Sequence, residues 1–172
     1  MRMYKEKRAQ VMQLPFGMLF SILLIAVFIF VAFFAIKIFL EQRDCSQTGL
    51  FINDLQSEVD NAWMSSETSS DVFSAVLPSG IEYVCFADLE AAEGLSGDEG
   101  IAEEIERNSP ERNMFFYPSR YACNMPAQII KHINITEITK YENPYCIENK
   151  RGRINMTIEK DYYEALVKIR RG

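Results

Sequence analysis

The four cysteines are the residues whose spacing says most about their chemistry. Cys45, Cys85, Cys123 and Cys146 are far apart, whereas zinc sites and redox motifs use cysteines only a few residues from each other. An even number of cysteines, all after a membrane segment described below, favours two disulfides formed in an oxidising compartment. Three pairings are possible, and the sequence leaves all three open.

His132 is the only histidine, so a Ser-His-Asp or Cys-His catalytic arrangement would have to use it. We expect the cysteines to be in disulfides and His132, beside Lys131 in a predicted strand, to be a surface residue. Residues 96–100 (SGDEG) lack the ligand spacing of a calcium loop. No glycine-rich nucleotide motif is present. The sequence therefore predicts no catalytic residue, no metal site and no cofactor.

Two Asn-x-Thr motifs are candidate glycosylation sites, at Asn134 (NIT) and Asn155 (NMT). Both follow the membrane segment, on the side that we expect to be exported. Asn155 is predicted on the polar face of its strand, because the apolar residues on either side of it alternate with polar ones.

The elements that must position these residues begin with a membrane anchor. Residues 16–36 form a run of 21 uncharged, mostly large apolar residues. At 1.5 Å per residue such a helix is roughly 31 Å long, about the thickness of the hydrocarbon core. The run is apolar on all sides, unlike an amphipathic core helix. We therefore predict a transmembrane helix over residues 15–40, with the lipid bilayer as its first partner.

The flanking charges set the expected orientation. Residues 1–14 form a basic tail in which Arg2, Lys5, Lys7 and Arg8 outweigh a single acidic residue. The positive-inside rule keeps this tail cytoplasmic and exports the rest of the chain. The chain as a whole has a formal charge of −6, so the exported part is acidic and would repel the phosphates of nucleic acids.

The residues just before the apolar run resemble a processing site. Residues 7–10 (KRAQ) are similar to the class III, prepilin-like signal of archaeal surface proteins. The resemblance implies cleavage between Ala9 and Gln10, which would remove a leader of residues 1–9. The family usually places a glutamate five residues into the mature chain, where this sequence has Leu14, so the docking carboxylate of pilins is missing. An uncleaved signal anchor stays open as the alternative.

The exported part is predicted to be an α+β domain stabilised by disulfides. Gly49 is expected to break the chain, so that residues 41–66 form a juxtamembrane segment and an amphipathic helix. Residues 67–172 are then β-rich, with one largely antiparallel sheet under the helix. An acidic insertion over residues 88–112 carries no basic residue up to Glu106 and is expected to be a solvated segment with a short helix.

The strands of this domain are predicted from alternating apolar residues and from turn signals. A hairpin is expected around residues 149–152 (NKRG), joining the two strands on either side of it. The expected strands are residues 72–77, 81–89, 113–117, 128–133, 135–140, 145–148, 153–159 and 163–170.

Several short segments resemble a family of small membrane-anchored proteins from small-genome archaea. They are residues 13–18 (QLPFGM), 77–86 (LPSGIEYVCF) and 143–147 (NPYCI). The resemblance implies the same anchored architecture and no particular activity.

Taken together, the sequence predicts a non-enzymatic, single-pass envelope or surface protein that acts as an interaction or assembly module. Its partners would be other envelope proteins or further copies of the chain, joined through the helix. A type IV pilin-like filament subunit, cleaved after Ala9, is the alternative. An envelope enzyme is a more remote one.

Overall fold

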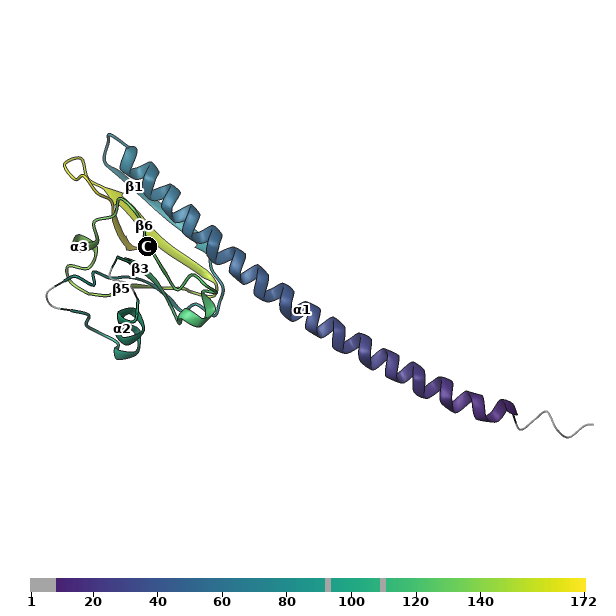
Figure 1. Ribbon diagram of the computed structural model, residues 1–172. Helices are drawn as coiled ribbons and strands as arrows, with labels where there is room; N and C mark the ends of the chain where they lie inside the picture. Colours follow the sequence, from purple (N-terminus) through teal and green to yellow (C-terminus); the bar gives the residue numbers. More distant parts are fainter. Residues whose placement is uncertain (1–8, 92–93, 109–110) are drawn as a thin grey trace, which may run out of the picture. The chain divides into compact units, whose positions relative to one another are not determined.

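The computed structural model describes residues 9–91, 94–108 and 111–172 (Figure 1). Two compact units are present, one up to Arg43 and one over Asp44–Gly172. The first consists of the apolar part of helix α1. The second combines the rest of α1 with two antiparallel sheets and two disulfides, so the predicted α+β class is confirmed.

Helix α1 is continuous from Ala9 to Met64, so the predicted break at Gly49 is wrong. A glycine inside a helix costs only about 1 kcal/mol relative to alanine. Here it lies beside Thr48 and Phe51, which are buried in the second unit and hold the helix in place. The end of α1 is capped from outside the helix, because the Lys160 ammonium donates hydrogen bonds to the carbonyls of Trp63 and Ser65.

The second half of α1 is amphipathic, as its sequence predicts. The residues at helical spacing that pack into the domain are Phe51, Leu55, Val59 and Ala62, each at most 6% exposed. Asp54, Glu58 and Asn61 lie on the solvated side. This stripe is the surface on which the domain is built.

Within the described residues, seven strands form two sheets, whereas the sequence predicts one. The first sheet has the order β1-β6-β7 and the second β4-β3-β2-β5, and every neighbouring pair is antiparallel. The strands are β1 (Ser69–Val76), β2 (Tyr83–Phe86), β3 (Met114–Tyr117), β4 (Ala127–Gln128), β5 (Tyr145–Glu148), β6 (Arg153–Lys160) and β7 (Lys168–Arg171).

The main core lies where α1 and the two sheets meet. Phe51 of α1 packs against Phe73 of β1 and Phe116 of β3, with ring centroids 5.9 and 5.8 Å apart. In β6 the predicted alternation is confirmed, since Ile154, Met156 and Ile158 are buried while the residues between them are not.

The second sheet is buried on both faces. Its other face packs against α2 (Glu99–Glu106), whose Ile101 and Ile105 join Cys85 and Phe115 in a smaller cluster. The short helix expected in the acidic insertion is therefore present as α2. Its apolar residues cover one face of the second sheet, and its acidic residues lie outside this contact. Two short segments complete the domain, the 3₁₀ turn η1 (Ser119–Tyr121) and helix α3 (Ile135–Ile138).

The predicted hairpin around residues 149–152 is wrong as a pairing of strands. The chain does reverse there, with Lys150 N donating to Arg153 O at 2.9 Å. However, β5 pairs with β2 and β6 pairs with β1, so the turn passes the chain from one sheet to the other. The Cys85–Cys146 disulfide holds β5 beside β2, and β6 pairs with β1 over eight residues. These two contacts place β5 and β6 in different sheets.

Two further predicted strands differ because side chains replace the ladder hydrogen bonds. Residues 135–140 contain helix α3, since Asn134 caps its start by accepting a hydrogen bond from Glu137 N at 3.1 Å. After β4, the backbone N–H and carbonyl of Ile130 bond to the side-chain amide of Asn113. Of the strand expected over residues 128–133, only Gln128 lies in a named strand, as the second residue of β4.

Candidate functional site

The apolar part of α1 is one candidate functional surface. It is the single helix in the described residues that is long and apolar enough to cross a membrane. The large hydrophobic residues from Met18 to Leu40 are between 39% and 74% exposed, so the described chain does not cover them. The hydroxyl of Ser21 donates to Gly17 O at 2.9 Å, which satisfies the polar group within the helix. These features fit a single-pass membrane anchor.

The first disulfide joins α1 to the loop after η1. Cys45 and Cys123 are bonded with their Cα atoms 5.7 Å apart. One turn further along α1, Gly49 lies near the end of the Met125 side chain, and Thr48 is fully buried with its hydroxyl bonded to Asp44 O. The start of the domain segment of α1 is thus fixed to the loop by a covalent bond and by packing.

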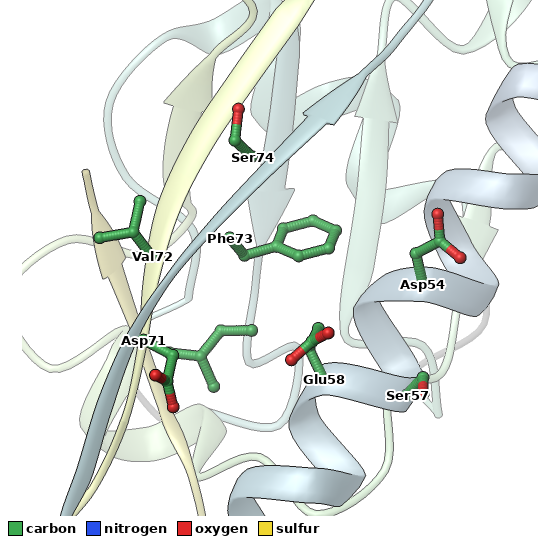
Figure 2. A pocket seen from close by; sticks show the side chains of 8 residues that line it. Asp54, Ser57, Glu58, Asp71, Val72, Phe73 and Ser74 are labelled. Carbon is green, nitrogen blue, oxygen red and sulfur yellow. The ribbon is translucent and has the colours of Figure 1, made fainter.

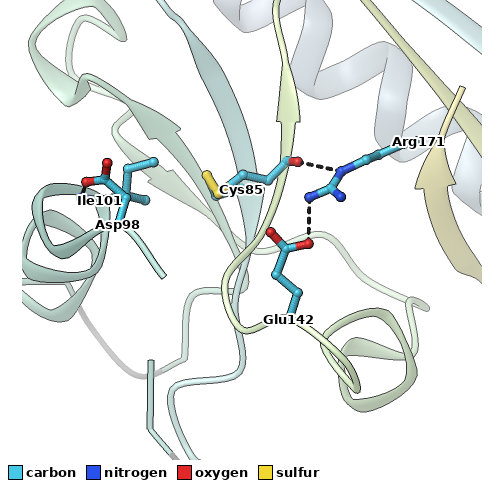
Figure 3. The surroundings of a disulfide bond; sticks show 6 residues. Cys85, Asp98, Ile101, Glu142 and Arg171 are labelled. Carbon is cyan, nitrogen blue, oxygen red and sulfur yellow. Dashed lines mark hydrogen bonds and ion pairs between the residues drawn. A yellow bond between two sulfur atoms is a disulfide. The ribbon is translucent and has the colours of Figure 1, made fainter. Parts of the chain in front are cut away.

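The second disulfide crosses two neighbouring strands. Cys85 of β2 lies directly opposite Cys146 of β5, and Cys85 is fully buried. Figure 3 shows Arg171 beside this bond, donating to Cys146 O at 2.9 Å and pairing with Glu142 at 2.7 Å. All four cysteines are therefore in disulfides, as predicted. The observed pairing, Cys45–Cys123 with Cys85–Cys146, is one of the three that the sequence leaves open.

The two candidate glycosylation sites have different surroundings. Asn155 is exposed on β6, on the face of the first sheet that points away from the core. Asn134 is half-buried, and its side-chain oxygen is used to cap α3. Whether either carries a glycan stays a prediction.

The candidate cleavage site lies at the start of α1. Ala9 is the first helical residue and Gln10 the second. Residues 1–8, most of the predicted leader, lie outside the described residues, as do positions 92–93 and 109–110 of the acidic insertion.

His132 is not in a strand, contrary to the prediction. Its backbone φ is +65°, and its imidazole stacks on the Trp63 indole with centroids 3.8 Å apart and planes 5° from parallel. Its Nδ1 lies 2.9 Å from an Asp60 carboxylate oxygen. The hydrogen bond to His132, more than any other cause, lowers the pKa of Asp60 below its usual value.

This group ties the end of α1 to two loops. Trp63 Nε1 donates to Ala165 O at 3.0 Å, and the Gln56 amide oxygen accepts from Lys131 N at 2.9 Å. The contacts that Trp63, Gln56 and Asp60 make with these loops are not among the predictions from the sequence. Gln56 and Asp60 are i, i+4 neighbours, and Trp63 follows Asp60 by three residues, so all three lie on one face of α1. This spacing is the sequence signal from which their shared contacts could have been predicted.

An acidic groove runs between α1 and β1 (Figure 2). It has a volume of about 490 Å³, and its charged lining residues are the carboxylates Asp54, Glu58 and Asp71. Within the described ranges, no set of three His, Cys, Asp or Glu side chains is placed to hold a metal ion. The groove therefore offers negative charge, and its described residues form no metal site.

Scans of protein-family models, of curated proteins and of solved structures found no match to this chain. The resemblances to an archaeal anchored family and to a prepilin-like signal therefore stay predictions. What the chain does must be inferred from its anchor, its disulfides and the surfaces of its domain.

Proposed function

We propose that this chain is a non-enzymatic, single-pass protein of the cell membrane whose domain, Asp44–Gly172, interacts or assembles with other envelope components outside the cytoplasm. The observation that carries the proposal is the apolar half of α1, exposed on all sides and leading into a disulfide-linked domain. Such a helix requires either lipid or other helices around it, because water would not solvate it favourably.

The orientation is supported by two independent features. The basic residues precede the apolar helix, which favours a cytoplasmic N-terminus. All cysteines follow it and are oxidised, which favours a domain on the outer side.

A labelling experiment tests this orientation. The Tyr163→Cys variant adds one thiol at a position that is 95% exposed, while the native chain, whose cysteines are all in disulfides, is the control. We expect a membrane-impermeant maleimide to label Tyr163→Cys in intact cells and to leave the native chain unlabelled. Labelling that requires permeabilised cells would place the domain in the cytoplasm and contradict the proposal.

A pilin-like filament subunit is the second candidate, and the continuity of α1 favours it. A subunit that polymerises through its N-terminal helix needs that helix to be apolar on all sides and to be part of its domain. In α1 the run of residues 16–36 is apolar on all sides, and the same helix continues to Met64. Cleavage after Ala9 would start the mature chain at the second helical residue. The leucine at position 14, in place of a docking carboxylate, would have to be compensated by apolar packing alone.

The mature N-terminus separates the two candidates. Intact-mass measurement of the native protein is expected to give a chain that begins at Gln10 if the pilin-like function holds. In that case Ala9→Trp, which puts a bulky side chain at the cut, should abolish cleavage, and the matched Ala9→Gly should retain it. A native chain that begins at Met1 would exclude the pilin-like candidate and leave the anchored module.

A further inference from the structure

Strand β1 is an open edge of the first sheet. Its strand partner within the described ranges is β6, and the register between the two runs unbroken from Ser69 to Val76. Outside the helices and strand ladders of the described chain, no backbone hydrogen bond uses a residue of β1. In an antiparallel pair, the backbone N–H and carbonyl groups of alternate residues point away from the partner strand. Along the outer side of β1 these groups are therefore available to another strand.

The acidic groove lies beside this edge (Figure 2). It is lined by Asp54, Ser57 and Glu58 of α1 and by residues 71–74 of β1, together with Ile158 of β6. Its three carboxylates are exposed, and none of the ion pairs within the described ranges includes them. The groove thus holds negative charge that no basic side chain of the described domain balances.

The three carboxylates lie on the side of the first sheet that faces α1. Asp71 is two residues from Phe73 in β1, so both project from the same face, and Figure 2 shows Phe73 pointing toward α1. A strand added to the free edge of β1 would direct every second side chain to this face, beside Asp54 and Glu58.

The spacing of the two helix carboxylates suits such a strand. Asp54 and Glu58 are four residues apart in α1, which is about 6 Å along the helix axis. Side chains on one face of a strand repeat every second residue, about 6.7 Å apart. Two basic residues separated by one other residue could therefore each reach one of these carboxylates.

The opposite face of β1 is more apolar. Figure 2 shows the Val72 side chain on the other side of β1 from Phe73. Val72 is 74% exposed, and Val76, four residues further along the same face, is 50% exposed. The side chains that alternate with the basic residues of an added strand would lie beside these valines. Apolar neighbours of this kind on adjacent strands stabilise a sheet.

Charge complementarity selects the occupant of this edge. The groove attracts lysine and arginine and repels carboxylates and phosphates. The β1 strand of a second copy would bring another Asp71 and no basic residue, so an identical strand is a poor match. The matching partner is a different chain that is basic on one face of an extended segment and apolar on the other.

We propose that the free edge of β1 and the acidic groove bind an extended basic segment of another protein, which joins the first sheet as a fourth strand. Lys or Arg side chains of the segment face α1, and apolar side chains alternate with them. In strand addition of this kind, main-chain hydrogen bonds provide affinity and the alternating side chains provide specificity. The inference rests on the proposed function, because it names the surface and the partner class of the interaction module.

Peptide binding to the full-length protein in neutral detergent tests this inference. The probe is a fluorescent peptide, Val-Lys-Val-Lys-Val-Lys-Val, followed by fluorescence anisotropy. Asp54→Asn combined with Glu58→Gln should weaken binding about tenfold, because two charge pairs at a partly exposed site are lost. The matched control, Glu99→Gln with Glu106→Gln, removes the same charge from exposed residues of α2 and should leave the affinity unchanged.

Two further measurements separate strand addition from charge attraction. The same peptide with every backbone nitrogen methylated keeps its charges but donates no main-chain hydrogen bond, and it should bind roughly tenfold more weakly. In hydrogen exchange followed by mass spectrometry, the unmodified peptide should slow exchange in β1. It should leave exchange in β4, an edge strand of the second sheet, unchanged.

The inference is overturned if the peptide does not bind the native chain or if the two double variants bind it equally. It is also overturned if the methylated peptide binds as well as the unmodified one, or if β1 gains no protection from exchange. These measurements are independent of the labelling of Tyr163→Cys in intact cells, so their failure would leave the proposed function standing.

Discussion

Replacing Gly49 by alanine tests whether α1 is continuous where the apolar helix enters the domain. In a helix interior alanine is more favourable than glycine by roughly 0.8–1.0 kcal/mol. A Cβ at this position would meet only the end of the Met125 side chain, at 3.9 Å, an ordinary contact. We therefore expect Gly49→Ala to raise the free energy of unfolding by about 1 kcal/mol.

The assay is guanidinium unfolding of the full-length protein in detergent, followed by tryptophan fluorescence. Trp63 is the only tryptophan and stacks on His132, so unfolding of the domain removes a specific contact of the fluorophore. The matched control is Gly152→Ala, at a turn residue with φ of +80°, where alanine is strained and should destabilise the domain. If Gly49→Ala were destabilising in the same way, the helix would end at Gly49 and the continuous α1 would be wrong.

Three other variants test the domain by the same unfolding measurement. Leu55→Ala, at a fully buried residue of α1, should lower the free energy of unfolding by about 2–5 kcal/mol. Leu50→Ala, at a residue 60% exposed on the same helix, should change it by less than about 0.5 kcal/mol. Equal effects would contradict the assignment of Leu55 to the buried face of α1. Replacing both Cys45 and Cys123 by alanine opens a loop with a sequence separation of 78 and should cost about 4 kcal/mol, and a loss below about 1 kcal/mol would refute a constraining role. The pKa of Asp60 is lower in the folded state than in the unfolded state. The Asp60 carboxylate therefore stabilises the fold above the unfolded pKa of about 3.9, and this stabilisation is lost as the pH falls through the folded-state pKa. Asp60→Asn should therefore weaken the acid dependence of the unfolding midpoint below about pH 4, and an unchanged dependence would show that the carboxylate is not stabilised in the fold.

Local sequence signals predicted most of the individual elements. The apolar run and the stripe of Phe51, Leu55 and Val59 indicate helix because their period is local to the chain. The alternation in β6 likewise identifies its buried face. Two disulfides could be predicted from the even number of cysteines and from the compartment in which they are expected to lie. This prediction needs no knowledge of the geometry of the fold.

The arrangement of these elements could not be predicted in the same way, because it depends on contacts between distant residues. The turn at residues 149–152 has the sequence of a hairpin, but the bonding partner of Cys146, which is Cys85, and the long partner strand of β6, which is β1, lie far away in the sequence. Asn134 lies in a segment whose apolar residues resemble those of a strand. Its side-chain oxygen accepts a hydrogen bond from Glu137 N, and this bond caps helix α3. The stacking of His132 on Trp63 joins residues that no local pattern connects.

Membrane extraction tests the central claim, that the apolar half of α1 is a membrane anchor. After alkaline carbonate treatment, the full-length protein should stay in the membrane pellet and be released only by detergent. Arginine at both Ile25 and Ile29 should shift it toward the soluble fraction, since each costs roughly 2.5–3.5 kcal/mol at the centre of a membrane helix.

The matched control places the same two arginines at Tyr162 and Tyr163, which are exposed in the domain, and should leave the protein in the pellet. Recovery of the unmodified full-length chain as a soluble monomer without detergent would contradict the anchor.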